Sequence, residues 1–290
     1  MKRLTCVAAL ASCLMVCGVP ATVFGQTPEV VVTEVKPPQF TAISWNVDSG
    51  GADPHVVAAR ISEMRDVALW GFCEVQSERW AELFQQAADG LEPGRFVRIF
   101  SPTAGNDRSC ILYDKTQFDC LGWFEFAWAG QPWYSLELHL RPGLVAHLCH
   151  RATKQQFYFM VNRIQGATAD KQAALLPQWA GQQDIPVLAV GTYDFEYRPD
   201  AQPSSAAGRR GYPTLPGTGV FQWVMPDNPI PTVSRGDLGA IDDFVLLADS
   251  QNKLTARSKV VSQPEDFPDN DMTPDHRPVS TTISMRSTGG

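Results

Sequence analysis

Polar side chains that could bind a metal ion or a phosphate recur just after the apolar segments of this chain. They are Asn46, Asp48, Glu74, Asp194, Asp243, Asp275 and His276. Because Mg²⁺ takes oxygen ligands and keeps several waters, carboxylate and amide groups gathered at one edge of a sheet would suit such a hard cation. A single Asp at the end of a strand also serves as a turn former. The prediction of a site therefore depends on the whole set and on the elements that bring it together.

The first third of the chain predicts two strands that alternate with two helices. The segment FTAISWNVDSGG predicts a strand over Phe40–Trp45, and VALWGFCEV predicts a second strand. Asp53 followed by Pro54 is typical of a helix N-cap with proline at the first helical position. The second helix is expected to start after Ser77 and to stop at Gly90. This order is typical of a layered α/β architecture.

Short strands dominate the rest of the chain. The middle third contains the apolar or alternating segments RFVRIF, SCILYD, FDCLGWFEFAW, WYSLELHLRPGLVAHLC and QFYFMVNRI. The segment TADKQAALLPQWAGQQ predicts a helix that Pro177 kinks, and PVLAVG predicts a buried strand that stops before a polar loop at Thr192. After a loop rich in Pro, Gly and Ser, Pro199–Thr218, strands are expected in VFQWVM, AIDDFVLL and RPVSTTISM. Together these segments predict one domain with two packed sheets flanked by helices.

The N-terminal residues are typical of a secretory signal peptide. Lys2 and Arg3 precede an apolar run that ends in small residues. The run is interrupted by a glycine and a proline and is shorter than the ~20 residues of a membrane span. We expect residues 1–25 to be removed on export to the periplasm or the medium, residues 26–38 to be disordered, and residues 39–286 to form the domain, with no membrane span in the mature chain. Because LASC resembles a lipoprotein cleavage box, lipid attachment stays open as an alternative.

Charge and cysteine content limit the partners. The net charge of -7 argues against broad binding to duplex nucleic acid, because Lys and Arg must neutralise its phosphates. A small or locally bound phosphate ester is compatible with this charge. Outside the expected signal peptide the cysteines are Cys73, Cys110, Cys120 and Cys149. They lack CxxC spacing, which argues against a zinc cluster, while disulfides and buried free thiols both stay open.

Several of these segments, in this order, resemble the motifs of one superfamily. The motifs are SWNVDSGG, WGFCEVQ, ILYDKTQF, RPGLVAHL, FYFMVNRI, PVLAVGTYDF, AIDDFVL and PDHRPV. From about Phe40 to Met285 the chain resembles the endonuclease/exonuclease/phosphatase superfamily, which includes deoxyribonuclease I, the abasic-site endonucleases and several phosphatases of lipids and nucleotides. The resemblance implies a deoxyribonuclease I-like four-layer α/β sandwich of two mostly antiparallel sheets. It also implies hydrolysis of a phosphate ester with Mg²⁺ or Mn²⁺ as cofactor.

The resemblance also implies a metal and phosphate shell built from four residues. Glu74 corresponds to the principal metal ligand. Asn46, Asp48 and Asp275 complete the shell of the metal ion and the phosphate. A cation in this position would neutralise charge on the phosphoryl oxygens as the transition state forms.

The remaining roles implied by the resemblance concern the phosphate and its protons. His276 corresponds to the histidine that contacts the scissile phosphate or moves a proton, and Asp243 to the residue that orients it. Asp242 competes with Asp243 for that role, but the match of DFVL to the family strand favours Asp243. Arg141 corresponds to the arginine that steadies the phosphate.

Three residues depart from the pattern of the superfamily. Relatives usually carry Gly-Asp-aromatic-Asn where this chain has Gly191, Thr192, Tyr193 and Asp194, and usually have histidine where it has Arg163. Threonine is no general base at neutral pH, and loss of a positioned base costs ~10²–10⁴-fold in rate. In an extended backbone, Asp194 would project to the same side as Thr192 and could hold water or metal. Arg163 would then offset its charge or bind the phosphate bidentately.

The predicted function is therefore an exported, metal-dependent phosphoesterase, whose activity the changes at Thr192, Asp194 and Arg163 would reduce. Its catalytic residues would include Asp194 and Arg163 besides His276, Asp243 and Arg141. The substrate would be a nucleic acid, a nucleotide or a small phosphoester, bound through Asn46, Arg141, Arg163 and His276. An inactive protein that binds a phosphoester or nucleic acid on the same fold is the alternative, followed by a purely structural exported protein.

Overall fold

The structure is a computed structural model that describes residues 37–126, 141–164, 169–197, 218–233, 240–263 and 272–286, without the side chains of 169–171 and 194–196. The expected signal peptide, nearly all of the expected disordered segment and most of the loop Pro199–Thr218 lie outside the described residues. Among the described helices, none has both the length and the apolar character that a membrane crossing requires.

The first sheet contains the strands from both ends of the domain. Its order is β11-β12-β1-β2-β4-β3, and only the β1–β2 pair is parallel. The strands are β1 (Gln39–Asn46), β2 (Val67–Val75), β3 (Phe96–Phe100), β4 (Arg108–Asp114), β11 (Leu254–Val260) and β12 (Val279–Met285).

The second sheet has six strands as well and comes from the middle of the chain. Its order is β5-β6-β7-β8-β10-β9, and only the β7–β8 pair is parallel. The strands are β5 (Phe118–Phe126), β6 (Gly143–His150), β7 (Gln156–Ile164), β8 (Val187–Tyr197), β9 (Gln222–Trp223) and β10 (Ile241–Ala248).

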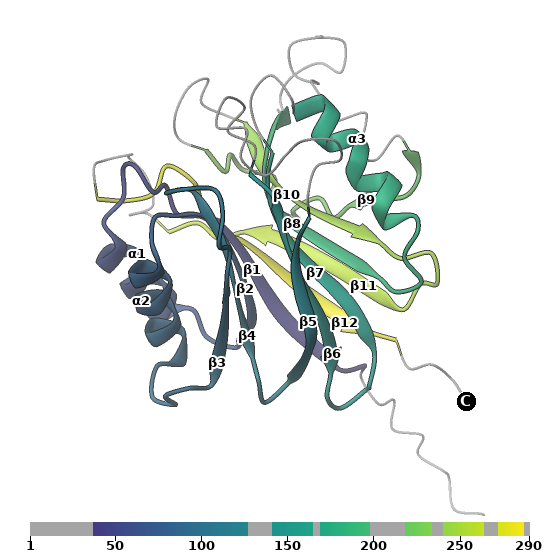
Figure 1. Ribbon diagram of the computed structural model, residues 1–290, viewed down its shortest axis with the longest axis horizontal. Helices are drawn as coiled ribbons and strands as arrows, with labels where there is room; N and C mark the ends of the chain where they lie inside the picture. The colour runs from purple at the N-terminus through teal and green to yellow at the C-terminus, as the bar shows by residue number, and fades with distance from the viewer. Residues whose placement is uncertain are drawn as a thin grey trace, which may run out of the picture. The chain divides into compact units, whose positions relative to one another are not determined.

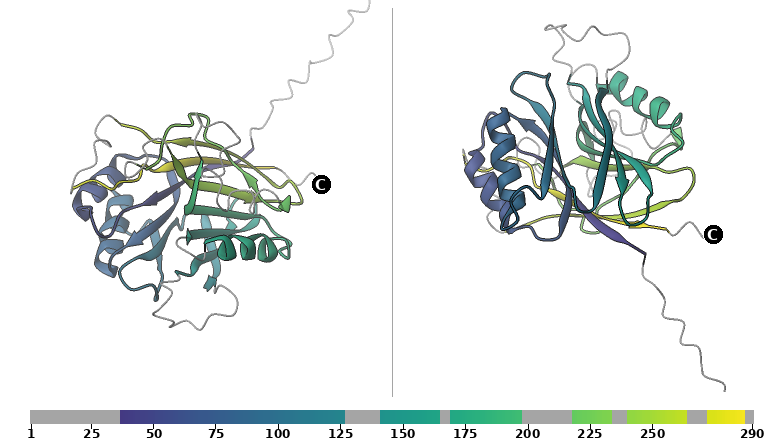
Figure 2. Two further views of the ribbon diagram at one scale, coloured as in Figure 1. Left: turned by 90° about the horizontal axis from the view of Figure 1, so that it is seen from above. Right: turned by 60° about the horizontal axis from the view of Figure 1, so that its bottom comes forward.

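In the part of the chain that the structure describes, three helices cover the outer faces of the two sheets. Helices α1 (Pro54–Glu63) and α2 (Glu78–Asp89) pack on the first sheet around Trp70 and Phe72, and α3 (Ala169–Ala180) packs on the second (Figure 1). The other two views show the same order of helices, sheet, sheet and helix (Figure 2). A third apolar core, with residues of both sheets, lies between them. The four-layer α/β sandwich with mostly antiparallel sheets is confirmed.

The close contact of the two sheets depends on a glycine in β2. A Cβ atom at Gly71 would lie 2.7 Å from Val161 Cγ2 and 3.0 Å from Val190 Cγ2, both in the second sheet. Real Cβ atoms do not approach carbon atoms that closely, so any larger residue would push β2 away from β7 and β8.

The predicted helix ends are confirmed. The Asp53 side chain accepts a hydrogen bond from the backbone N–H of His55 at 2.8 Å, and Pro54 starts α1. Ser77 caps α2 in the same way, and Gly90 ends it with φ +56°. These caps satisfy backbone N–H groups that have no partner inside the helix.

Some strand predictions were wrong. The strand expected to stop before Thr192 continues to Tyr197, because the polar residues pair with β10 and β7. Strand β11, Leu254–Val260, was not predicted, since its sequence LTARSKV suits an edge strand with an exposed, charged face. In VFQWVM only Gln222–Trp223 is a strand. All four cysteines outside the expected signal peptide are free thiols.

Candidate functional site

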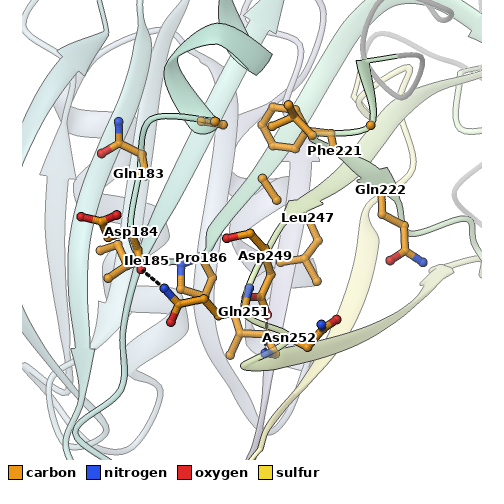
Figure 3. A pocket seen from close by; sticks show the side chains of 17 residues that line it. Gln183, Asp184, Ile185, Pro186, Phe221, Gln222, Leu247, Asp249, Gln251 and Asn252 are labelled. Atoms are coloured by element: carbon orange, nitrogen blue, oxygen red, sulfur yellow. Dashed lines mark hydrogen bonds between the residues drawn. The ribbon is translucent and has the colours of Figure 1, made fainter.

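A polar pocket lies where β8 begins and β10 ends, away from the predicted site residues. Ile185 and Pro186 line it from one side, and Asp249 and Gln251 from the other (Figure 3). The side-chain amide of Gln251 donates to the backbone carbonyl of Asp184 at 3.2 Å across it. None of the predicted site residues lines this pocket.

Three neighbouring strands of the second sheet hold Arg163, Thr192 and Asp243 in one row. Thr192 of β8 is directly opposite Arg163 of β7 and Asp243 of β10. Side chains of directly opposite residues share one face of a sheet. The next row, with Ile164 and Tyr193, packs in the core beneath α3. The row of Arg163, Thr192 and Asp243 therefore faces the first sheet.

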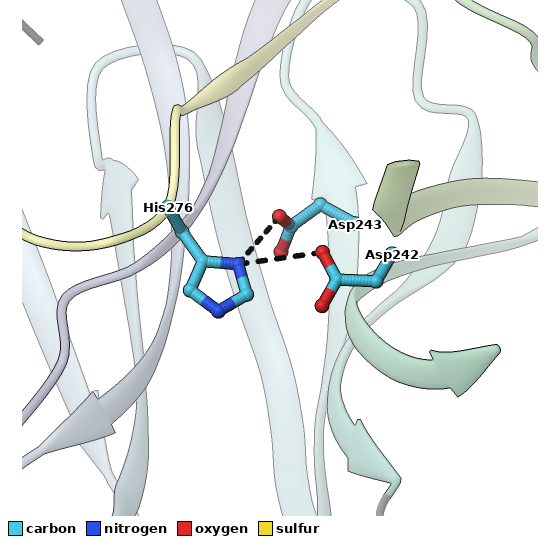
Figure 4. A group of neighbouring side chains, drawn as sticks. All are labelled: Asp242, Asp243 and His276. Carbon is cyan, nitrogen blue, oxygen red and sulfur yellow. Dashed lines mark hydrogen bonds and ion pairs between the residues drawn. The ribbon is translucent and has the colours of Figure 1, made fainter. Parts of the chain in front are cut away.

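His276, just before β12, is held by the carboxylate of Asp243. Its Nδ1 atom lies 2.8 Å from Asp243 Oδ2 (Figure 4). The Thr192 hydroxyl donates to Asp243 Oδ1 at 2.6 Å, and Trp45 Nε1 donates to the backbone carbonyl of His276 at 3.0 Å. Burial alone would lower the pKa of His276, but the negative charges of Asp243 and Asp242 outweigh burial and raise it to about 10. The ring is therefore an imidazolium at neutral pH, with its Nδ1–H directed at Asp243.

Asp242 and Asp275 bring two more carboxylates to this ring. Asp242 Oδ1 lies 3.5 Å from His276 Nδ1 and accepts a hydrogen bond from the Thr232 hydroxyl at 3.1 Å. Burial raises the pKa of Asp242 more than the charge of His276 lowers it, and the charge of Asp243 raises it further. Asp275 Oδ1 lies 3.7 Å from His276 Nε2. Because Asp243 makes the shorter contact to Nδ1, it fits the orienting role better than Asp242.

Glu74 lies near the end of β2 in a backbone conformation that is rare for a residue with a side chain. Its φ is +58°, where the register of β2 with β4 shifts between Phe72 and Val75. Such irregularities redirect a side chain and recur at functional sites. Glu74 Oε1 accepts from Arg163 Nε at 2.6 Å and from Asn46 Nδ2 at 3.0 Å. Burial alone would raise the pKa of Glu74, but the charge of Arg163 and the hydrogen bond from Asn46 lower it overall.

The backbone fixes which end of the Asn46 amide faces Glu74. The backbone N–H of Asp48 donates to Asn46 Oδ1 at 3.1 Å, so the NH₂ group points at Glu74. Asn46 and Asp48 are buried at the end of β1, which runs parallel to β2. The parallel pairing explains how the side chains at the ends of both strands meet at one edge of the sheet.

Arg141 contacts Glu74 and a residue that was not predicted, Asp107. Arg141 Nη2 donates to Asp107 Oδ2, and Arg141 Nη1 lies 4.0 Å from Glu74 Oε1. Asp107 Oδ1 accepts from the Ser49 hydroxyl at 2.5 Å. Asp107 lies in the loop before β4, where the sequence GNDR reads only as a turn. No sequence signal marked it as a partner of Arg141.

The position of the expected catalytic base is buried and committed to another contact. Thr192 is fully buried, and its hydroxyl proton is directed at Asp243. Asp194 belongs to β8, but its side chain lies outside what the structure describes, so its pairing with Arg163 stays a prediction. Gly191 has φ +132°, and a Cβ there would lie 2.0 Å from the backbone oxygen of Asn162. Only glycine lets β8 pass β7 this closely just before Thr192.

The arrangement at Glu74 does not fit the expected divalent cation. A cation such as Mg²⁺ needs an oxygen lone pair at ~2.0–2.1 Å. Two donors already approach Glu74 Oε1, from Arg163 and Asn46, and Arg141 brings a second guanidinium. The Asn46 oxygen, the other expected ligand atom, accepts from Asp48 instead. A dication at this carboxylate would meet the positive charges of Arg163 and Arg141.

One group of described side chains has the spacing of metal ligands. Ligand atoms of Asp242, Asp243 and His276 all lie within 4.8 Å of one another. Carboxylates and imidazole are common metal ligands, but the imidazole must be neutral to coordinate. Here Nδ1 of His276 is directed at Asp243 at 2.8 Å. An ion bound through Nδ1 would have to replace this pair.

No protein-family model matches the sequence, and no curated protein matches it. Solved structures are similar. An endonuclease/exonuclease/phosphatase family protein from Bacteroides thetaiotaomicron shares 15% identity with a TM-score of 0.62, over 87% of this chain and 100% of that one. A mannosyl-6-phosphatase from Bacteroides thetaiotaomicron VPI-5482 shares 15% identity with a TM-score of 0.61, over 85% and 100%. TDP2 from D. rerio, in complex with a single-strand DNA product, shares 13% identity with a TM-score of 0.63, over 85% and 99%.

These likenesses extend over nearly the whole of each solved chain. They show that this chain has the fold of the endonuclease/exonuclease/phosphatase proteins, as the sequence resemblance implied. The structures that share the fold include a phosphatase and a protein bound to a DNA product.

Proposed function

We propose that this chain binds a phosphate ester at the edge of the two sheets and hydrolyses it slowly. The observation that carries the proposal is the pair of His276 and Asp243, with 2.8 Å between Nδ1 and Oδ2. A buried imidazolium whose tautomer is fixed by a carboxylate can neutralise a phosphoryl oxygen and donate a proton. The net charge of -7 favours a nucleotide or another small ester over duplex nucleic acid as the substrate.

In this proposal the proton comes from His276. Water attacks phosphorus, the bond from phosphorus to the leaving oxygen breaks, and the imidazolium donates its Nε2 proton to that oxygen. Arg163 and Arg141 stabilise negative charge on the phosphoryl group. The attacking water releases its proton to solvent, because the Thr192 hydroxyl is no general base at neutral pH. We therefore expect a rate ~10²–10⁴-fold below that of an enzyme with a positioned base.

The dependence on Mg²⁺ or Mn²⁺ that the resemblance implies is a separate part of the proposal. An ion that takes part would need a carboxylate other than Glu74, such as Asp48 or Asp275. No step above passes through an ion, so rates in Mg²⁺, in Mn²⁺ and in a chelator test the dependence directly.

A second candidate is a protein that binds phosphoesters without turnover. The buried Thr192 favours binding without turnover. Its hydroxyl donates to Asp243 and is no base that could take a proton from water. Binding without turnover would still need Arg163, Arg141 and His276.

The test is hydrolysis of bis(p-nitrophenyl) phosphate and p-nitrophenyl phosphate by the purified protein. The blank is His276→Gln, which removes the charge, and the control is Arg257→Gln, whose side chain is 81% exposed. We expect His276→Gln to lower the rate by ~10²-fold or more and Arg257→Gln to leave it unchanged. A wild-type rate equal to the blank would reject hydrolysis. Inorganic phosphate that still binds the wild type but not His276→Gln would then favour the second candidate.

We also propose that the chain is exported after removal of residues 1–25, because Lys2 and Arg3 precede an apolar run that ends in small residues. Mass spectrometry of the periplasmic and secreted fractions should find a mature protein that starts near residue 26. A full-length protein that stays in the cytoplasm would contradict export.

A further inference from the structure

Among the described residues, three positive side chains at this edge each have a carboxylate partner. The pairs are Arg163 with Glu74, Arg141 with Asp107, and His276 with Asp243. The first of these pairs is unexpected, because Glu74 is the residue that the sequence assigns to a metal ion. Its carboxylate is 14% exposed and the Arg163 side chain 17% exposed, so the pair is largely shielded from water.

The contact of Arg163 with Glu74 occupies one oxygen of the carboxylate that a cation would need. A carboxylate oxygen has two lone pairs in its plane. At Oε1 of Glu74 two donors approach, Arg163 Nε at 2.6 Å and Asn46 Nδ2 at 3.0 Å. The amide of Asn46 cannot turn its oxygen to the ion without losing the hydrogen bond from the Asp48 N–H at 3.1 Å.

The backbone also holds Arg163 in this place. It lies in the interior of the second sheet, on β7, and is paired in register with Thr192 of β8. The unusual φ of Glu74, +58°, directs its side chain at this arginine from the other sheet. The pair therefore joins two sheets whose positions are fixed by the core between them.

We propose that Arg163 permanently takes the place of a divalent cation beside Glu74, so that the phosphate site carries a built-in positive charge and binds no metal ion through this carboxylate. A guanidinium supplies one positive charge where a divalent ion supplies two, but its donors match a phosphate bidentately. It also cannot dissociate or be removed by a chelator. The contact of Arg163 with the phosphate rests on the proposed function. The exclusion of a metal ion from Glu74 by Arg163 does not depend on that function.

The test compares Mn²⁺ binding to the purified wild type, Glu74→Gln, Arg163→Gln and the double variant, by titration calorimetry and by the electron paramagnetic resonance signal of free Mn²⁺. Glu74→Gln keeps an oxygen that can accept from Arg163 and Asn46 but removes the charge. We expect wild type and Glu74→Gln to bind Mn²⁺ equally, at any other site that the chain has. Arg163→Gln should gain a Mn²⁺ site that binds at least about tenfold more tightly than the wild type does. The double variant, which lacks the carboxylate of Glu74, should lose this site again.

Arg257→Gln removes an exposed arginine that pairs with Asp227, and should bind Mn²⁺ as the wild type does. If Glu74→Gln weakens Mn²⁺ binding of the wild type by about tenfold or more, Glu74 binds the ion and the proposal is wrong. A folded Arg163→Gln that gains no site dependent on Glu74 also contradicts it. If Arg163→Gln does not fold, the comparison of wild type with Glu74→Gln decides alone.

A second arm measures binding of inorganic phosphate in a chelator and in Mn²⁺. We expect the wild type to bind phosphate with the same affinity in both. Arg163→Gln should bind phosphate about tenfold or more weakly, because it lacks one charge-assisted hydrogen bond. Phosphate binding that requires Mn²⁺ and is lost in Glu74→Gln would overturn the proposal. Failure of the proposed function would look different: no phosphate binding and no turnover under any condition, with the Mn²⁺ comparison unchanged.

Discussion

At the scale of single residues, the site is a set of neighbouring ion pairs. Asp243 holds His276 through Nδ1, and the charge of that imidazolium outweighs burial and lowers the pKa of Asp243. The Thr192 hydroxyl donates to the second oxygen of Asp243. The hydroxyl of Thr192 therefore helps to fix the orientation of Asp243, and through Asp243 that of His276.

The first prediction concerns the titration of His276. Its pKa is raised to about 10, so the imidazolium should persist at pH 8 in the wild type. Asp243→Asn removes the largest favourable charge, and the pKa of His276 should then fall, although Asp242 and Asp275 still raise it. In the wild type the pKa of His276 is higher in the folded than in the unfolded state. The stabilisation that the charged His276 gives to the fold is therefore complete below pH ~6.5 and is lost as pH rises toward ~10.

The measurement is the pH dependence of the His276 ring signals by NMR, with urea unfolding at each pH. A wild-type His276 that titrates near pH 6.5 would show that Asp243 does not hold its proton.

Residue types that carry chemistry could be predicted from the sequence, but their partners could not. Six of the predicted site residues stand in short motifs at strand ends, where the spacing predicts a position at the edge of a sheet. They are Asn46, Asp48, Glu74, Asp243, Asp275 and His276. The partner of Arg163 depends on how two sheets face each other, which no local pattern encodes. Asp107 lies in a loop without a motif and meets Arg141 only through the fold.

At the scale of elements, turns and caps hold the strands at their lengths. Asp114 ends β4 and is fully buried, and its carboxylate accepts from the N–H and hydroxyl of Thr116, from Arg95 and from Gln117. Burial alone would raise the pKa of Asp114, but the hydrogen bonds from Thr116 and Arg95 lower it overall. This one side chain therefore fixes the turn between β4 and β5.

The second prediction follows from that turn. Asp114→Ala leaves Arg95 and Thr116 without their acceptor and should lower the free energy of unfolding by about 3 kcal/mol. Asp119→Ala, whose side chain is 47% exposed, is the control and should change it by less than about 0.5 kcal/mol. Because the folded-state pKa of Asp114 is the lower one, its contribution is present above pH ~3.9 and is lost as pH falls through the folded value. Equal unfolding free energies of the two variants, by urea titration, would contradict the role of the turn.

Elements with strong local signals could be predicted well, and those fixed by pairing could not. Caps at Asp53 and Ser77 and the apolar pattern of VALWGFCEV predict their elements from neighbouring residues alone. Strand β8 continues through Thr192 only because Arg163 and Asp243 lie beside it. Strand β11 exists because β12 offers it a partner.

At the scale of the whole domain, two sheets meet face to face and the site lies at one edge of their contact. The order of the strands could be predicted only through the resemblance, since pairing between distant segments has no local signature. The contact of the sheets has one narrow point, at Gly71, where β2 meets Val161 and Val190. Spacing between the sheets also sets the distance between Glu74 and Arg163.

The third prediction tests this spacing. Gly71→Ala should lower the free energy of unfolding by about 1–3 kcal/mol, because its Cβ overlaps Val161 and Val190. Gly122→Ala, with no heavy atom within 4 Å of the added Cβ, is the control and should be near neutral. The measurement is urea unfolding of both variants. If Gly71→Ala is as stable as Gly122→Ala, the sheets are not in contact at this point.

In our proposal Arg163, and no metal ion, neutralises Glu74 at the phosphate site. Anomalous diffraction at the manganese edge, from crystals grown with Mn²⁺ and inorganic phosphate, tests this directly. We expect Arg163 Nε on Glu74 Oε1, phosphate between the arginines and His276, and no manganese peak at Glu74. A manganese peak at ~2.1 Å from a Glu74 oxygen, with Arg163 turned away, would contradict it.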